Sequence, residues 1–557
     1  MADAALHRRR FLLAAAAVGA APAVARAAEP GLLLHGGPIY TGRDDAPRAE
    51  AVLTRGKRIV FVGALSEARA LAAGAREIDL KGAAAYPGFV DAHAHMTEIG
   101  LQSFVLDLTG TTSVADLQAR LRAYAQANPG PGSIFGRGWI ETHWPDKRFP
   151  NRDDLDAVVP DRPVLLGRSD GHAGVANSQG LVLAGIAPAT PDPDGGQILR
   201  DGSGRPNGML VDHAWGEAEH RLPDAPTAVR REALRRADRL YLSRGWTGLH
   251  HMSVSAEDLG LLRGLAGDRG IALRVDNFMA PEAADDVLAR GPSADPTGLV
   301  RVRGVKMYMD GALGSRGAAL LAPYADSPGS TGLLLSDPAR MAPILDRAWK
   351  SGAQVATHAI GDRGNRLVLD GYQAAFARAG GEGRRARWRV EHAQILAPAD
   401  IPRFARLGVI ASMQPSHAIG DLYFAGQRLG PDRLKGAYAW KSLLDSGAVV
   451  CAGSDAPVEK GDPLIEFYAA TWRHALDGFA GPDWGLGQAV SRQRALAMLT
   501  RAPAYAVGRE HELGVLEAGK LADLTVFSTD IMTAPPADIL KARAVLTVVD
   551  GAVAYEA

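Results

Sequence analysis

Residues 86–96 read YPGFVDAHAHM, a short apolar run that ends on two histidines, His93 and His95. A β/α barrel draws its catalytic side chains from the ends of several different strands. Four later apolar runs also end on a polar residue: Lys306 in VRGVKMYMDG, His358 in AQVATHAIGD, His392 in WRVEHAQ and Asp455 in AVVCAGSDAP. The ordered set predicts an α/β fold, a TIM-like (β/α)8 barrel with a metal site at its mouth.

Secondary-structure patterns and composition divide the chain into several predicted parts. Strand-like runs alternate with Ala- and Arg-rich helical stretches over residues 87–507, which predicts the barrel. Residues 31–86 and 508–557 instead read as short β segments, so we expect both termini to form one composite β-sandwich domain. Residues 111–245 are rich in Gly, Asp and Pro and break the alternation. They predict a subdomain inserted within the barrel and folded over its mouth.

Length and charge restrict the class of protein. At 557 residues the chain is too long for a single compact core. Lys plus Arg equals Asp plus Glu, at 62 each, so the formal net charge is zero and nothing indicates nucleic acid or an anionic membrane as a partner. Cys451 is the only cysteine, which excludes an intramolecular disulfide, and its apolar neighbours predict a small core residue.

The first 27 residues have the pattern of a targeting segment. Arg8, Arg9 and Arg10 precede an Ala-rich apolar stretch that ends at Ala25-Arg26-Ala27. This is typical of a twin-arginine-type signal peptide cleaved after residue 27, and it predicts contact with the twin-arginine export machinery and a periplasmic or secreted protein. The stretch is too short and too weakly apolar for a stable membrane anchor. A disordered basic tail is the alternative.

The two histidines of residues 86–96 suit metal binding. Side chains two apart in a strand share a face, so His93 and His95 point the same way. Imidazole binds zinc, iron, nickel or manganese, and an H-x-H pair supplies two ligands at once. An H-x-H pair alone is weak evidence for a metal site. The four further strand-end residues make the evidence strong.

With these motifs the sequence resembles the amidohydrolase superfamily, and within it the amidohydrolase family 3 branch (YtcJ-like and N-substituted formamide deformylase-like). The resemblance runs from about residue 31 to the C-terminus. It implies a TIM-like barrel, a composite β-sandwich and a metal centre that activates water for hydrolysis. It is carried by PGFVDAHAH, GVKMYMDGALGSRGAALL, THAIGDRGN, RVEHAQ, ASMQPSH, GSDAPV and GKLADLTVF.

The resemblance also implies roles for single residues. His93 and His95 match ligands of the first strand, and His358 and His392 match those of the fifth and sixth. Lys306 stands where related enzymes carry a lysine carboxylated by CO2, whose carbamate bridges two metals. The alternative is an uncarboxylated Lys306 paired with Asp310, which leaves a site for one metal. The metal is expected to be divalent, with zinc as the default and one or two ions per chain.

Asp455 matches the eighth-strand aspartate and is expected to act as both metal ligand and catalytic base. Capping of a helix before Pro457 is its structural alternative. His172, in RSDGHAGVANS, is the second candidate catalytic residue, and it would polarise a carbonyl or bind the leaving group. The candidate substrate-binding residues are His417, Trp139 and Tyr308, with Trp144 beside them. Orienting hydrogen bonds are expected from Asp310 and Asp362, and no ligand role from His250 and His251.

We therefore expect an exported metal-dependent amidohydrolase that cleaves an amide-type C–N bond of a small molecule. Hydrolysis of a carbamate, ester or cyclic imide, or deamination, is the alternative on the same site, because the fold alone does not select the reaction. A catalytically silent periplasmic binding protein is the alternative from another class. The tryptophans of the insertion suggest an apolar or aromatic N-substituent on the substrate. A homodimer is expected only because such dimers are common.

Overall fold

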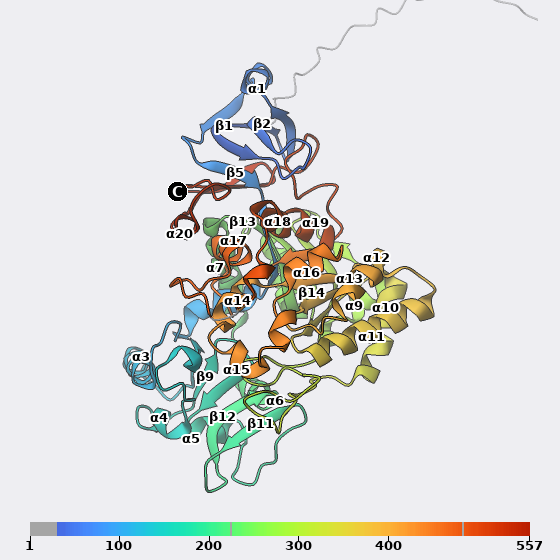
Figure 1. Ribbon diagram of the computed structural model, residues 1–557. Coiled ribbons are helices and arrows are strands. Elements are labelled where there is room, and N and C mark those ends of the chain that lie inside the picture. The colour runs from blue at the N-terminus through green and yellow to red at the C-terminus, as the bar shows by residue number, and fades with distance from the viewer. Residues whose placement is uncertain (1–30, 223–224, 482–483) are drawn as a thin grey trace, which may run out of the picture.

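The computed structural model describes residues 31–222, 225–481 and 484–557. The predicted signal peptide, residues 1–27, lies outside this range. The described residues form three sheets (Figure 1). Among these residues, no helix has the length and apolar character needed to cross a bilayer.

Eight parallel strands form the barrel, in the order β20-β19-β18-β17-β16-β14-β13-β6. Between β6 and the end of β20, the N–H of Asp455 donates to the carbonyl of His93 at 2.7 Å and that of His95 to Ala456 at 2.8 Å. The predicted α/β barrel is confirmed. Its strands are β6 (Phe89–Ala94), β13 (Trp246–Val254), β14 (Arg274–Met279), β16 (Val300–Tyr308), β17 (Gln354–Ala359), β18 (Arg389–His392), β19 (Ile410–Met413) and β20 (Val450–Ala452).

Helices connect the barrel strands, and a glycine often ends the helix that leads into the next strand. α7 ends at Gly245 in the left-handed region (φ 97°), one residue before β13. A side chain there would be strained, and its Cβ would lie 2.8 Å from Cγ2 of Thr525. The larger connecting helices are α7 (Thr227–Arg244), α8 (Ala256–Gly267), α10 (Pro338–Ser351), α11 (Asp362–Ala379), α13 (Ile401–Leu407), α16 (Trp440–Asp445), α17 (Pro463–Trp472), α18 (Arg492–Leu499) and α19 (Arg501–Ala506).

Strands from both ends of the chain share a second sheet, in the order β23-β22-β21-β5-β1-β2-β3, with β4 beside β1. β5 (Ala84–Pro87) pairs antiparallel with β21 (Leu524–Phe527) and so joins the two ends. A buried ion pair between Arg274 on β14 and Asp523 ties this sheet to the barrel. The remaining strands are β1 (Gly31–Tyr40), β2 (Arg48–Arg55), β3 (Arg58–Gly63), β4 (Ala75–Asp79), β22 (Ala544–Val549) and β23 (Ala552–Glu556).

The third sheet, of order β11-β12-β10-β9-β8-β7, lies in the chain between β6 and β13. Figure 1 shows it at the end of the barrel opposite the composite sheet. Its strands run from Leu106 to Asp212, and α7 then leads to β13, so the sheet overlaps the predicted insertion 111–245. The strands are β7 (Leu106–Asp107), β8 (Ile134–Trp139), β9 (Val164–Arg168), β10 (Ala173–Ala176), β11 (Gly196–Arg200) and β12 (Pro206–Asp212).

Further helices complete this subdomain and the barrel mouth. The subdomain carries α3 (Val114–Ala127), α4 (Arg152–Asp156), α5 (Ser178–Leu183) and α6 (His213–Glu219). The barrel mouth carries α2 (Met96–Leu101), which follows β6, and α14 (Pro415–Asp421), which follows β19.

Candidate metal centre

His93 and His95 lie at the end of β6 and face the carboxylate of Asp455. Nε2 of His93 is 3.3 Å from Oδ1 of Asp455, and Nε2 of His95 is 3.2 Å from the same oxygen. Ligands about 2.0–2.2 Å from a tetrahedral zinc stand about 3.4 Å from one another. The three side chains therefore have the spacing of ligands around one cation.

The protonation states of His93 and Asp455 suit a cation. Burial lowers the pKa of His93 to about 4, so the imidazole is neutral and keeps a lone pair for a metal. Burial acts to raise the pKa of Asp455, but the imidazoles of His93, His95 and His392 outweigh it and hold the pKa well below its ordinary value. The site thus combines the neutral nitrogen donor of His93 with the anionic oxygen donor of Asp455.

His392 ends β18 in the left-handed region, with φ 71°. Its Nδ1 lies 2.8 Å from Oε1 of Gln414, so Nδ1–H donates to the amide oxygen and Nε2 is left for the site. Its ring centroid lies 4.9 Å from that of His93 and 4.5 Å from that of His358. Nε2 of His358 is buried without a hydrogen-bond partner among the described residues.

Lys306 is fully buried on β16, and its Nζ lies 3.4 Å from Nε2 of His93. Among the described residues no carboxylate forms an ion pair with it. Asp310 instead accepts backbone N–H groups at 2.8–2.9 Å, from Ala319, Ile360 and Gly361. The alternative of a Lys306–Asp310 pair is therefore wrong. Burial lowers the pKa of Lys306 to about 8, which increases the share of free amine.

The inserted subdomain brings His172 to the barrel mouth. Its ring centroid lies 5.2 Å from that of His358, and its Nδ1 lies 2.8 Å from Oδ1 of Asp212. Burial lowers the pKa of His172, but Asp212, with Asp170 and Asp455, outweighs this and raises it overall. When protonated, the imidazole has its Nδ1–H held by Asp212 and its Nε2–H free to donate to a substrate oxygen.

His417 on α14 lies beside the ligands. Its Nε2 is 3.7 Å from Oδ2 of Asp455, and its ring stacks on His392 at 5.8 Å and 17°. Two sets of three residues each have donor atoms within 4.8 Å of one another. One set is His93, His95 and Asp455, and the other is His392, His417 and Asp455.

Other predicted residues lie elsewhere or have other partners. Trp139 and Trp144 are buried in the core of the inserted sheet, and their indole N–H groups donate to Leu166 and Thr111. This packing role corrects the expected substrate contact of Trp139, because both faces of a core indole contact protein. Tyr308 does lie at the site: its hydroxyl is 2.5 Å from Oγ of Ser253, and its ring centroid is 4.6 Å from Nζ of Lys306.

The remaining polar candidates have structural partners. Asp362 accepts the N–H of Leu321 at 2.8 Å at the start of α11. His250 is 2.9 Å from Arg389, and His251 accepts the N–H of Met96 at the start of α2. None of the three joins the groups of ligand-type atoms.

Four side chains that orient the site were not predicted from the sequence: Glu391, Arg389, Gln414 and Asp212. Glu391 and Arg389 lie two apart on β18, so both point into the barrel, and Glu391 contacts His93. The charged pair within the apolar run WRVEH is the signal that could have identified them. For Asp212, forty residues from His172 in the chain, the sequence carries no such signal.

The donor set fits a divalent metal. Unpartnered imidazole nitrogens at His358 and His417 lie beside an anionic carboxylate, and burying polar atoms without partners is costly unless they bind something. Neutral imidazole with carboxylate is the donor combination of zinc and related ions.

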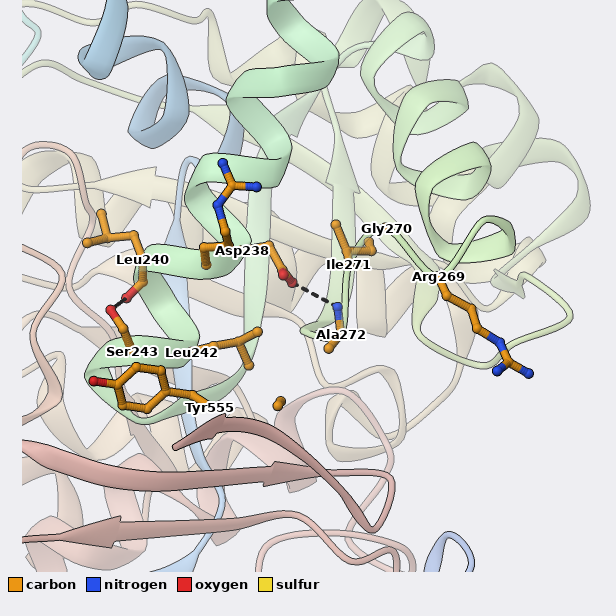
Figure 2. A pocket seen from close by; sticks show the side chains of 11 residues that line it. Asp238, Leu240, Leu242, Ser243, Arg269, Gly270, Ile271, Ala272 and Tyr555 are labelled. Atoms are coloured by element: carbon orange, nitrogen blue, oxygen red, sulfur yellow. Dashed lines mark hydrogen bonds between the residues drawn. The ribbon is translucent and has the colours of Figure 1, made fainter. Parts of the chain in front are cut away.

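A surface pocket of about 590 Å³ lies away from these residues, between α7, the turn before β14 and β23 (Figure 2). It contains the carboxylate of Asp238, which accepts the N–H groups of Ala272 and Leu273 at 3.0 and 2.9 Å. Both bonds go to Oδ1, and no histidine among the described residues lines this pocket, so it lacks the cluster of ligand-type side chains found at the barrel mouth.

The comparisons with known proteins agree with this geometry. The amidohydrolase family matches residues 76–555. YtcJ of Bacillus subtilis (strain 168), named as an amidohydrolase, is 32% identical over 530 residues, which cover 94% of this chain and 99% of that protein. The N-substituted formamide deformylase of Arthrobacter pascens is 31% identical over 533 residues, covering 91% and 95%. A metal-dependent hydrolase of Pyrococcus horikoshii OT3 superposes with a TM-score of 0.74 at 27% identity, covering 91% and 99%.

Proposed function

The chain belongs to the amidohydrolase family and is a metal-dependent hydrolase of non-peptide carbon–nitrogen bonds, and on this basis we propose that it hydrolyses an amide-type bond of a small molecule. The main support for this proposal is the arrangement of His93, His95 and Asp455. Nε2 of each histidine lies 3.2–3.3 Å from Oδ1 of Asp455. Membership of a hydrolase family makes the binding-protein alternative wrong.

A divalent metal, with zinc as the default, would be held by His93, His95 and Asp455, and when bound it would acidify water and polarise a substrate carbonyl. Asp455 is ionised beside the imidazoles and takes the proton from the attacking water. It then gives that proton to the departing amine, so one carboxylate serves as base and then as acid. His172 donates Nε2–H to the carbonyl oxygen as negative charge develops there.

We also propose that Lys306 is carboxylated. Its buried amine attacks CO2 to form a carbamate, with release of one proton, and the product carries two anionic oxygens in place of a cation. The amine lies 3.4 Å from a neutral imidazole and forms no ion pair among the described residues. Burial outweighs the charges of Glu391 and Asp455, which favour its cationic form. The carbamate oxygens would be further ligands for metal.

The relative that names a substrate class favours an N-substituted formamide or a related amide. The tryptophans of the insertion no longer support an aromatic N-substituent, because they are buried away from the site. Assays with N-alkyl and N-aryl formamides, larger amides, carbamates, esters and cyclic imides test the reaction type. We expect turnover of the amides above all. Faster turnover of esters or imides, lost in Asp455→Asn, would identify the alternative hydrolysis on the same site.

The proposal includes export to the periplasm by the twin-arginine machinery, which rests on residues 8–27 of the sequence. Replacing Arg9 and Arg10 with lysine keeps the positive charge and removes the paired guanidinium groups. We expect the wild type in the periplasmic fraction and the double variant in the cytoplasm. Equal distribution of the two proteins would contradict export by this route.

A further inference from the structure

A cavity of about 210 Å³ lies where the inserted subdomain meets loops of the barrel mouth. One side is formed by residues 141–149 of the subdomain, and the other by residues 316–326 and 423–428 of the barrel. The proposed metal ligands do not line it. Since a cavity of roughly 150 Å³ can hold benzene, this one has room for a small aromatic molecule.

The two carboxylates that line this cavity are already paired. Glu141 accepts hydrogen bonds at both of its oxygens from Arg168, at 2.8 and 3.3 Å. Asp326 accepts from Arg316 at 3.3 and 3.0 Å, and also from Arg428. Neither carboxylate is therefore left to attract a cationic ligand.

Lys147 gives the cavity an excess of positive charge. This exposed residue lines the cavity, and its Nζ forms no ion pair or hydrogen bond among the described residues. Asp170 shares Arg168 with Glu141. The lining and its ion-pair partners thus hold four cations and three carboxylates: Lys147, Arg168, Arg316 and Arg428 against Glu141, Asp170 and Asp326.

Two further hydrogen-bond donors of the lining have no partner among the described residues. Thr142 is 8% exposed, and its Oγ1 is buried without a hydrogen bond. Arg316 uses Nε and Nη2 for Asp326, which leaves Nη1 unbonded there. A hydroxyl and a guanidinium N–H both donate to carboxylate oxygens. Phe149 and Phe424 supply apolar surface to the same cavity.

We propose that this cavity binds a small organic anion, a carboxylate carried on an aromatic body. Lys147, Thr142 and Nη1 of Arg316 would bind the carboxylate, and the phenylalanine rings would contact the aromatic body. The backbones of Lys147 and Arg316 also lie in the left-handed region, with φ 47° and 63°. Such strained conformations tend to occur where a ligand is held. The inference does not depend on the proposed function, because the cavity is separate from the metal ligands.

Calorimetric titration of the metal-loaded protein with benzoate, and with benzyl alcohol as its neutral analogue, tests the site. We expect saturable binding of benzoate and at least about 10-fold weaker binding of benzyl alcohol. Lys147→Gln removes the unpaired charge, and Thr142→Val removes the hydroxyl with little change of shape. Each should weaken benzoate binding about 10-fold, the usual effect of losing a hydrogen bond to a charged group.

Lys541→Gln is the matched control, because Lys541 is an exposed lysine that pairs with Asp538 outside the cavity, and it should bind benzoate as wild type does. Benzoate bound to the metal instead of the cavity would keep its affinity in both cavity variants. Lys147 is exposed, so Lys147→Gln is expected to fold and still decides the question if Thr142→Val does not. Circular dichroism checks the folding of each variant.

Three results would overturn the inference. They are no saturable binding of benzoate at millimolar concentration, wild-type affinity in Lys147→Gln, or equal affinity for benzyl alcohol. Turnover of N-substituted formamides is measured on the same proteins without benzoate. If turnover persists while benzoate binding fails the test, the anion site is wrong and the proposed function stands.

Discussion

Nδ1 of His93 lies 2.5 Å from Oε2 of Glu391, a fully buried contact between β6 and β18. Nδ1–H therefore donates to the carboxylate and Nε2 keeps its lone pair toward Asp455. Arg389 lies two residues before Glu391 and donates to both of its oxygens. Its Nη2 also donates to Oγ of Ser412 at 2.5 Å. The ligand is thus oriented by an ion pair inside the barrel.

Glu391→Gln keeps an oxygen for His93 but removes the charge that orients it and leaves Arg389 buried without a carboxylate. We expect zinc affinity to fall about 10- to 100-fold, the usual cost of losing such a partner. Competition with a chromophoric chelator measures it. The matched control is Asp523→Asn, which breaks an equally buried pair with Arg274 far from the site. Equal zinc affinities of Glu391→Gln and wild type would show that Glu391 has no role in metal binding.

Asp455→Asn removes the proposed proton acceptor while keeping the size of the side chain. At saturating zinc we expect kcat for a formamide substrate to fall at least about 100-fold, within the range for loss of a general base. Asp538→Asn serves as the control and should keep the wild-type rate, because Asp538 lies on α20 (Pro536–Ile539) with a half-exposed carboxylate that pairs with Lys541. A kcat for Asp455→Asn within about threefold of wild type would assign the proton transfer to another group.

If Lys306 is carboxylated, the carbamate carbon should give a 13C NMR signal that requires this residue. Wild-type protein equilibrated with 13C-bicarbonate should show a carbamate resonance by NMR, and Lys306→Arg should lack it, because a guanidinium has no free amine to attack CO2. Removing CO2 should lower the activity of the wild type. Identical spectra from the two proteins would contradict the carbamate.

We expect Asp238 to make the free energy of unfolding depend on pH, independently of the metal. Burial raises the pKa of this carboxyl group to about 6, against the two N–H groups that lower it. The folded state therefore binds the proton more tightly than the unfolded one. The stabilising effect is complete below the ordinary pKa of an aspartate, about 3.9, and is lost as pH rises through 6.

Asp238→Asn removes this titration and keeps an oxygen for both N–H groups. Its stability relative to wild type should rise between pH 4 and pH 7, by at most about 3 kcal/mol. Calorimetric unfolding of both proteins at each pH measures the difference. A difference that is constant over this range would contradict the raised pKa.

The sequence predicted the barrel and the strand-end residues because these depend on local patterns. A short apolar run that stops at a polar residue is visible without knowledge of strand register, as at His93 and Asp455. The partners that orient these residues depend on which strands lie side by side. The contacts of Glu391 with His93 and of Gln414 with His392 cross between strands far apart in the chain.

The direction of some site side chains depends on backbone conformation and could not be predicted from the sequence. On a regular strand, His392 would point away from the face shared by Arg389 and Glu391. Its left-handed backbone, like that of Asp455 at φ 59°, ends the strand and brings the side chain to the site. Such a conformation costs a residue other than glycine on the order of 1–3 kcal/mol and tends to occur at functional sites. Neither residue type reveals it in advance.

We propose that cleavage of an amide bond depends on a metal held by these side chains. The most direct measurement is the release of amine from N-substituted formamides by protein as isolated, after chelation, and after zinc is restored. We predict turnover as isolated, loss of at least about 100-fold on chelation, and recovery with zinc. Full activity in protein shown to be free of metal would contradict a metal-dependent reaction.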